Sequence, residues 1–394
     1  MRDVYRNAAI TLAAAASASS HGGMLNSYGY DQPEVKKYCH LQLHSSSPRS
    51  ESVQLSSFYK KESFMECIDE LPLSHRAWTL QERLLSQRIL HYGKDQIYFQ
   101  CRMKHLNADR TPVHDSYSIR RRSNRALLNL SKPPEQELLP KNQIATSGDW
   151  VNEAWRGVIS AYTGCRELTM PSDKLPALSG IVSLFQTKTN DQHMAGLWKG
   201  DLLHGLLWRL GDYTGIGSLN WRRFPARAPS WSWASWDGLI TFPFNAMKQV
   251  QDDYNAILIG AEVQTKGLNP YGEVSKGCLK LKCWTRTMTF KEITETIGLP
   301  ALDQPRPTWP QNANRQFESQ ESCLQDDHVY TVVCVGTFQF GSPSNIPKGY
   351  LLLDPAPVGS VDGYRRVGMA PHVSWNHLDN FDPRHWKQAD LAIV

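Results

Sequence analysis

The sequence predicts an α/β fold in which a first region of helices and strands is followed by a helical segment and a β-rich carboxy-terminal region. Three observations predict it: a strand–helix–strand pattern near the amino terminus, apolar residues at helical spacing in the middle, and short β-branched or aromatic runs thereafter. With 394 residues, 41% of them hydrophobic, the chain is long enough for several cores. We expect domains at residues 1–102, 103–215 and 216–394.

Composition excludes several protein classes. The formal charge of +5 is too dilute for a nucleic-acid partner, which needs basic residues concentrated on one face. No run reaches the roughly 18 apolar residues of a membrane span. The eight cysteines are scattered through a long chain, which favours reduced thiols and a cytoplasmic location.

The first residues allow two interpretations. Arg2 and Arg6 precede an apolar run at 8–16 with a small-residue pattern ending at Ala18, which is typical of a secretion signal. Asp3 lies where such a signal is purely basic, and alanine makes the run only mildly hydrophobic. The alternative is the end of a helix followed by a buried strand at 10–14, which agrees with the cytoplasmic interpretation.

In the remainder of the first region, a helix follows Ser74, which we expect to cap its first amides. Residues 26–57 show no sustained period and predict loops with one short strand. The predicted elements are a strand at 38–43, the helix at 76–85, and strands at 89–92 and 96–101 around a turn at 93–95.

The helix at 76–85 carries the most informative motif, R-x-W-x-x-Q-E-x-L-L-S, which begins at Arg76. Trp78 and Glu82 lie one turn apart, and Gln81 precedes the acid. A glutamate on a largely buried helix must be paired, with Arg76, Arg83 or a backbone amide as the available partners. Glu82 therefore either anchors the helix or, as the candidate catalytic residue, serves a polar ligand or acid–base chemistry.

Beyond residue 102, periodicity predicts helices and then strands. The predicted helices are 150–162, 175–185 and 201–208. The predicted strands are 230–235, 256–264, 279–290, 329–338 and 350–353, with a long exposed loop at 305–322.

A second motif, A-P-S-W-S-W-A-S-W-D-G, begins at Ala228. Its period of two predicts a strand with Trp231 and Trp233 on one face and Trp236 leaving it at the turn. If exposed, the indoles form a platform for sugar rings, as in a secreted carbohydrate-binding module. If buried, they form an aromatic seam between the helical and β-rich regions, which the alternating small serines favour.

Signatures of common catalytic and metal sites are absent from the sequence. It contains no phosphate-binding loop, dinucleotide fingerprint, H-E-x-x-H or G-x-S-x-G motif. Cys278 and Cys283 are separated by four residues, and no second pair of Cys or His residues at a matching spacing completes a zinc-ligand set. We therefore expect no metal site and no cofactor.

The R-x-W-x-x-Q-E-x-L-L-S motif resembles the end of the fungal heterokaryon-incompatibility (HET) domain. Further blocks resemble HET proteins: L-T-x-P-x-D-K-L-P-A-L-S-G at 168–180, A-G-L-W at 195–198, the tryptophan motif, and Y-R-R-V-G at 364–368. The resemblance implies fungal non-self recognition and cell-death signalling through protein partners, possible association with other HET or signalling domains, and Arg76, Trp78, Gln81 and Glu82 as site residues.

The HET domain is also distantly similar to the Toll/interleukin-receptor (TIR) domain. That likeness implies a parallel sheet flanked by helices, and nucleotide hydrolysis by analogy alone. The family's opening blocks, similar to Y-x-x-L-S-Y-x-W-G and W-I-D-x-L-C-I-x-Q, are not in this sequence. We therefore expect residues 1–102 to be the carboxy-terminal half of a HET domain, in a truncated or degenerate copy more suited to signalling than to catalysis.

Overall fold

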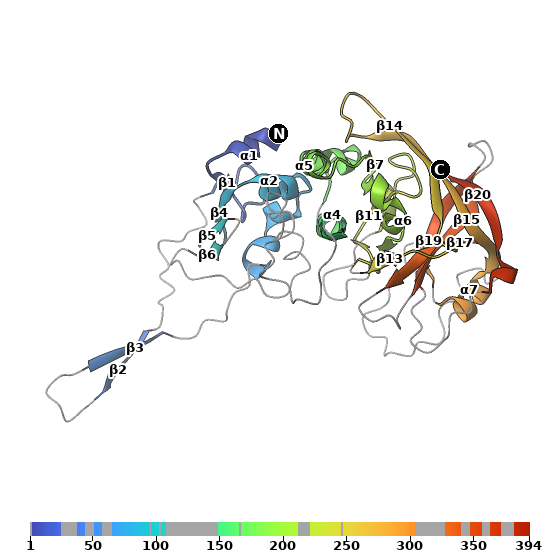
Figure 1. Ribbon diagram of the computed structural model, residues 1–394. Helices are drawn as coiled ribbons and strands as arrows, with labels where there is room; N and C mark the ends of the chain where they lie inside the picture. Colours follow the sequence, from blue (N-terminus) through green and yellow to red (C-terminus); the bar gives the residue numbers. More distant parts are fainter. Residues whose placement is uncertain are drawn as a thin grey trace. The chain divides into compact units, whose positions relative to one another are not determined.

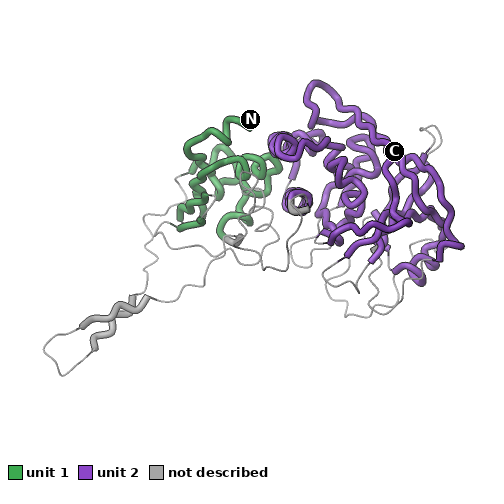
Figure 2. The backbone as a smooth tube through the Cα atoms, viewed as in Figure 1, with its two compact units in different colours: residues 1–121 green, residues 122–394 purple. Residues whose placement is uncertain are grey.

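The computed structural model describes residues 2–24, 38–43, 51–56, 65–94, 96–101, 104–107, 149–164, 167–211, 221–245, 247–298, 300–303, 328–339, 347–356, 363–371 and 382–394. The chain forms two compact units, residues 1–121 and 122–394, coloured separately in Figure 2. The helices expected within 103–215 and the strands expected beyond 215 lie in the same second unit. The long loop expected at 305–322 lies outside the described residues.

Unit 1 is a mixed α/β unit whose sheet has the order β1-β4-β5-β6. Its helical elements are α1 (Arg2–Asn7), η1 (Met65–Asp69), η2 (Pro72–His75) and α2 (Trp78–Leu85). Its strands are β1 (Thr11–Ala13), β2 (Tyr38–Leu43), β3 (Glu51–Ser56), β4 (Arg88–Tyr92), β5 (Ile97–Cys101) and β6 (His105–Leu106). β1 and β4 are parallel, whereas β4–β5 and β5–β6 are antiparallel. The expected partial parallel sheet is therefore present.

Strand β1 is more exposed than we expected. It pairs with β4 from Thr11 opposite Ile89 to Ala13 opposite His91. Leu12 is 52% exposed and the preceding Ile10 is 44% exposed, so the prediction of a buried strand is wrong. Among the described strands β1 has a neighbour on one side only, and its outward residues lack the cover that would bury them.

The helix of the first motif is confirmed, but its start differs from the prediction. Ser74 does not cap α2; its hydroxyl donates to the carbonyl of Ile68 at 2.8 Å. The 3-10 turn η2 leads into the helix, and the hydroxyl of Thr79 donates to Arg76 O at 2.7 Å. The sequence pattern identified the helix correctly and misassigned the residue that stabilises its first turn.

The predicted strands of unit 1 are confirmed. β4 and β5 form the expected hairpin, closed by a 3.0 Å bond from Gly93 N to Gln96 O. The predicted strand at 38–43 is β2, and it pairs antiparallel with β3, which lies in a stretch that the sequence analysis assigned to loops.

Unit 2 begins with helices at the predicted places. They are α4 (Asp149–Gly164), η3 (Pro171–Lys174), η4 (Pro176–Leu178), α5 (Ser179–Thr189), η5 (Lys199–Asp201) and α6 (Leu202–Gly205). The predicted helix at 201–208 is shorter than expected, since only Leu202–Gly205 is α-helical. The remaining helical elements of the unit are η6 (Trp233–Ser235), α7 (Phe290–Thr296) and η7 (Pro383–His385).

Four of the five strands predicted in unit 2 are confirmed, as β14, β15, β17 and β18, and the structure adds others that the sequence analysis did not predict. The strands of unit 2 are β7 (His193–Met194), β8 (Leu197–Trp198), β9 (Arg209–Leu210), β10 (Arg222–Arg223), β11 (Trp236–Asp237), β12 (Ile240–Thr241), β13 (Lys248–Val250), β14 (Ile257–Thr265), β15 (Val274–Thr289), β16 (Ala301–Leu302), β17 (Val329–Gln339), β18 (Lys348–Pro355), β19 (Tyr364–Pro371) and β20 (Lys387–Ile393). The prediction of a strand at 230–235 is wrong, because Trp233–Ser235 form η6.

Five of these strands close into a barrel with the order β17-β18-β19-β20-β15, because β15 also pairs with β17 (Figure 1). The length of β15 makes the closure possible. Its middle pairs with β20, from Leu279 opposite Ile393, and its end pairs with β17, from Trp284 opposite Cys334. A closed ring leaves no unpaired edge among its own strands.

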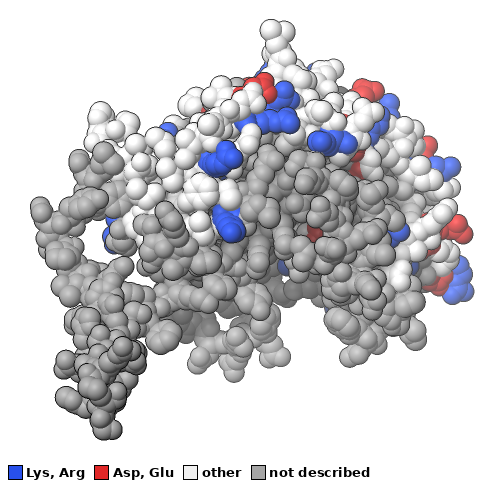
Figure 3. Space-filling model, turned by 60° about the vertical axis from the view of Figure 1, so that its left-hand side comes forward, with Lys and Arg blue, Asp and Glu red and all other residues white. Residues whose placement is uncertain are grey.

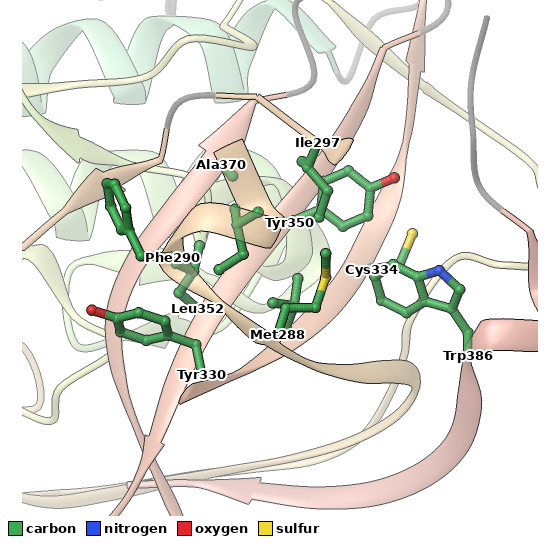
Figure 4. Close-up of a cluster of buried hydrophobic side chains, with 11 residues drawn as sticks. Met288, Phe290, Ile297, Tyr330, Cys334, Tyr350, Leu352, Ala370 and Trp386 are labelled. Carbon is green, nitrogen blue, oxygen red and sulfur yellow. The ribbon is translucent and has the colours of Figure 1, made fainter. Parts of the chain in front are cut away.

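A hydrophobic cluster packs α7 against one face of the barrel strands (Figure 4). Phe290 and Ile293 of α7 meet alternate residues of β17 and β18, as the two-residue period of a strand requires. Tyr350 stacks on Trp386 with ring centroids 5.7 Å apart. The buried residues of this cluster are Met288, Phe290, Ile293, Ile297, Tyr330, Val332, Cys334, Tyr350, Leu352, Ala370 and Trp386.

Candidate functional site

A chain of polar side chains crosses the interior of unit 1. Arg83 of α2 forms an ion pair with Asp69 at the end of η1. Its Nε donates to Gln100 Oε1 of β5 at 3.0 Å, and the same oxygen lies 2.8 Å from His91 Nε2 of β4. We call Asp69, Arg83, Gln100 and His91 the polar chain. It connects the π-helix η1, the helix α2 and the β4–β5 hairpin.

Strand register explains why the polar chain assembles. Ile89 lies opposite Gln100 and His91 opposite Tyr98, so His91 and Gln100 are diagonal neighbours on the same face. The burial of alternate residues shows that this is the inner face of the hairpin, with His91 only 3% exposed. Buried polar groups need partners, and here they partner one another.

The electrostatics of the polar chain favour a structural role. Burial, followed by the positive charge of Arg83, lowers the pKa of His91 to about 3, so the imidazole is neutral at physiological pH. A glutamine oxygen only accepts hydrogen bonds, so the bond to Gln100 requires that His91 donates from Nε2. With this nitrogen protonated and engaged, His91 is a poor base at neutral pH.

The residues proposed from the first motif have different environments. Arg76 is exposed, Trp78 and Glu82 are half-buried, and Gln81 is only 1% exposed. Glu82 does not pair with Arg83, whose partner is Asp69. Instead Glu82 accepts a hydrogen bond from Tyr5 of α1, and burial together with the charge of Glu82 raises the pKa of that phenol to about 12. Glu82 thereby links α2 to α1.

The tryptophan motif lies entirely inside unit 2. Trp231 and Trp233 are 0% exposed and Trp236 is 3% exposed. The segment forms a turn rather than a strand, because the Ser232 hydroxyl accepts a 3.1 Å bond from Ala234 N and starts the 3-10 turn η6. The alternating large and small residues, interpreted as a strand period, instead fit a tight turn between packed elements.

The three indoles contact both helices and strands of unit 2. Trp233 donates to Gly196 O at 2.9 Å and meets the ring of Tyr162 on α4 edge-on. Trp231 packs against Gly277 of β15, where an added Cβ would lie 3.0 Å from the indole. Such burial leaves no indole face for a sugar ring, so the alternative of a tryptophan platform for carbohydrate is wrong.

Sequence reasoning missed the polar chain and the buried ion pairs of unit 2. Three of the four ion pairs join residues at least 45 positions apart, whereas Arg227 and Asp237 are 10 positions apart. A weak signal was available in β4 and β5, where His91 and Gln100 occupy the alternating positions of the inward face. The ion pairs are Arg156–Asp201, Lys174–Asp237, Arg227–Asp237 and Arg366–Asp303.

Asp237, in the tryptophan motif, is partly exposed and pairs with two buried cations of unit 2. Lys174 Nζ lies 3.0 Å and Arg227 Nη2 2.9 Å from the same carboxylate oxygen. Burial lowers the pKa of Lys174 to about 8, and the charge of Asp237 opposes that effect. Lys174 also lies 5.9 Å above the ring of Trp233, so the motif's acid and indole fix the same ammonium group.

Within the described residues, no group of three or more metal-ligating side chains comes together. No described helix is long and apolar enough to cross a membrane. On the face shown in Figure 3, basic and acidic side chains of the described residues are interspersed among uncharged ones.

Comparison with known proteins connects unit 1 to a family. Residues 1–82 match the family model described as Heterokaryon incompatibility protein (HET). The matched segment contains α1, β1, η1 and the Trp78–Glu82 part of α2. Neither the search of curated proteins nor the search of solved structures found a match. Residues 1–82 of this chain are therefore similar to the heterokaryon-incompatibility (HET) family.

Proposed function

We propose that this protein takes part in fungal non-self recognition and signals incompatibility cell death in the cytoplasm through association of HET domains. The family match over residues 1–82 supports the role. The cysteines within the described residues are free thiols, which agrees with a reducing compartment.

The observation that carries the proposal is the exposed apolar surface of α1 and β1. Val4 is 69%, Ile10 44% and Leu12 52% exposed. Among the described strands β1 pairs only with β4, so one side of its backbone is open to another strand. We call this surface, formed by Val4, Ile10, Leu12 and the open side of β1, the β1 edge.

The partner that we propose for the β1 edge is a second copy of the same domain. Residues 7–20 contain no charged side chain, so antiparallel pairing of two β1 strands brings no like charges together. A two-fold axis near Leu12 places the apolar residues of both copies against each other, as an isologous interface requires.

We also propose a TIR-like arrangement for unit 1. The parallel β1–β4 pair, with α2 in the connection between the strands, supports it. Glu82, the candidate catalytic residue, is engaged by Tyr5, and this contact supports an anchoring role. The account therefore predicts signalling without nucleotide turnover. Robust NAD cleavage by the purified full chain would contradict that part.

The test is loss of viability when the full chain is expressed in fungal cells. Leu12→Lys places a charge on the β1 edge, and we expect it to abolish killing at unchanged protein level. Leu268→Lys is the matched control, because Leu268 is the most exposed of the large hydrophobic residues in the described part and lies in unit 2. Equal killing by the two variants, or loss only in Leu268→Lys, would refute the proposal.

A further inference from the structure

Strand β14 is a second open edge, on the outside of the strands of unit 2 (Figure 1). It is nine residues long and pairs with β15 alone among the described strands. Ile257 is 59% and Ile259 54% exposed. The two residues project outward by the alternation of the strand, and the register shift between Leu258 and Gly260 leaves Ile259 without a partner residue on β15.

The outer face beside this edge is basic. Lys276, Lys280 and Lys282 of β15 are exposed, and no described carboxylate forms an ion pair with any of them. In register they lie opposite Gln264, Gly260 and Ile257 of β14. Two carboxylates share this face: Glu262 of β14 itself, and Asp390 of β20, which lies opposite Lys282. The surface thus combines open backbone groups, two isoleucines and a row of lysines.

Gly260 connects the open edge to the lysine row. It lies opposite Lys280, and a Cβ built at Gly260 would meet nothing within 4 Å. A strand added beside β14 would lie two strand spacings of about 4.8 Å each from β15. The combined length of a glutamate and a lysine side chain spans this distance. An acidic side chain opposite Gly260 therefore has an open path to Lys280.

We propose that β14 binds an extended acidic segment of a partner protein, which adds to the sheet as a further strand. The backbone of β14 provides the ladder, Ile257 and Ile259 contact apolar side chains of the segment, and the lysine row attracts its carboxylates. The face carries three lysines against two carboxylates, Glu262 and Asp390, and its net positive charge disfavours a basic segment. This site belongs to unit 2 and is independent of the β1 edge in unit 1.

The experiment uses the full chain and two labelled peptides, with fluorescence anisotropy as the readout. The acidic peptide is acetyl-Val-Thr-Val-Thr-Glu-Thr-Glu-Thr-amide, whose valines and glutamates project from the same face of a strand, and the basic peptide has lysine in place of each glutamate. We expect the acidic peptide to bind with a salt-sensitive affinity and the basic one not to bind. Lys280→Gln is expected to weaken binding about tenfold, and Gly260→Val to weaken it similarly by filling the path to Lys280. Lys291→Gln, on α7, is the matched control and leaves binding unchanged.

Hydrogen exchange provides the second readout, because strand addition must slow exchange of the β14 amides. Slower exchange at 257–265 with the acidic peptide supports the proposal. Four results overturn it: equal binding of both peptides, equal loss in Lys280→Gln and Lys291→Gln, unchanged exchange of β14 with bound peptide, or no peptide binding. Self-association that protects β14 without peptide, or preferential binding to phosphatidylserine vesicles through the same lysines, also overturns it.

Discussion

The two tryptophan-containing motifs of this protein lie in contrasting environments. In unit 1, Trp78 and Glu82 are half-buried and Arg76 is exposed, and Glu82 links two helices. In unit 2, Trp231 and Trp233 are completely buried between helices and barrel strands. The comparison teaches that a conspicuous sequence motif does not by itself indicate a binding surface. The motif of unit 2 is buried and stabilises the fold, whereas part of the motif of unit 1 is accessible to solvent.

The largest predicted effect is on stability and concerns the buried tryptophan motif of unit 2. Trp233→Ala removes a fully buried indole and its bond to Gly196 O, and we expect the free energy of unfolding to fall by about 3–5 kcal/mol. Urea denaturation monitored by circular dichroism measures it. Trp78→Ala is the comparison variant, for which we expect a smaller loss because Trp78 is half-buried. Equal losses in the two variants would remove the distinction.

The next prediction concerns the polar chain. Arg83→Met takes the cation away from buried Asp69 and a donor away from Gln100, at an expected cost of about 2–4 kcal/mol. Arg6→Met, at an exposed arginine of unit 1, is the control and should change stability by about 0.5 kcal/mol or less. If both variants unfold at the same urea concentration, the polar chain does not stabilise unit 1.

The next prediction concerns how His91 makes the free energy of unfolding depend on pH. Its pKa is about 3 in the folded protein and 6.5 when unfolded, so below pH 6.5 the unfolded chain binds a proton that the folded one excludes. The contribution of His91 is therefore fully present above pH 6.5 and lost as the pH falls toward 3. We expect a loss of about 2 kcal/mol at pH 5 from this residue.

His91→Gln tests that prediction, because glutamine retains a donor toward Gln100 and does not titrate. The free energy of unfolding of the variant should depend less on pH between 7 and 5, by about one proton. Asp69, Arg83 and His105 are the other charged or titratable groups that act on His91, and they are unchanged in the variant. Identical pH dependence of the two proteins would show that His91 is not held neutral.

The smallest effect is expected at Tyr5. Tyr5→Phe removes the hydrogen bond to Glu82 and should lower the free energy of unfolding by about 0.5–1.5 kcal/mol. Spectrophotometric titration of the wild type should also show one phenol ionising near pH 12, absent from the variant. A change in unfolding free energy too small to measure would mean that Glu82 does not anchor α2 to α1.

Local periodicity predicted much of the secondary structure. The 3.6-residue spacing of Trp155, Val158 and Ile159 indicated α4, and alternation around Gly93 indicated the β4–β5 hairpin. Both signals are contained within about 16 residues and are nearly independent of tertiary contacts. The tryptophan motif misled the prediction because alternation of large and small residues is shared by strands and by tight turns between packed elements.

The rest depends on contacts between distant residues. Barrel closure requires β15 to pair with both β17 and β20, more than 40 and 100 residues away. The polar chain joins residues from the π-helix η1, the helix α2 and the β4–β5 hairpin. No local pattern in the sequence indicates how these three elements pack against one another. The sequence analysis considered Arg76, Arg83 or a backbone amide as partners of Glu82, because partners close in sequence can be recognised from the sequence. A contact with the distant Tyr5 cannot be recognised in this way.

The central claim is that unit 1 associates through β1 while the tryptophan motif of unit 2 remains internal. Amide hydrogen exchange of the purified full chain across a concentration series tests it most directly. The account predicts that exchange at residues 11–13 slows as the protein associates and that exchange at 231–236 stays constant and slow. Association that leaves residues 11–13 unprotected, or rapid exchange at 231–236 in the folded protein, would contradict it.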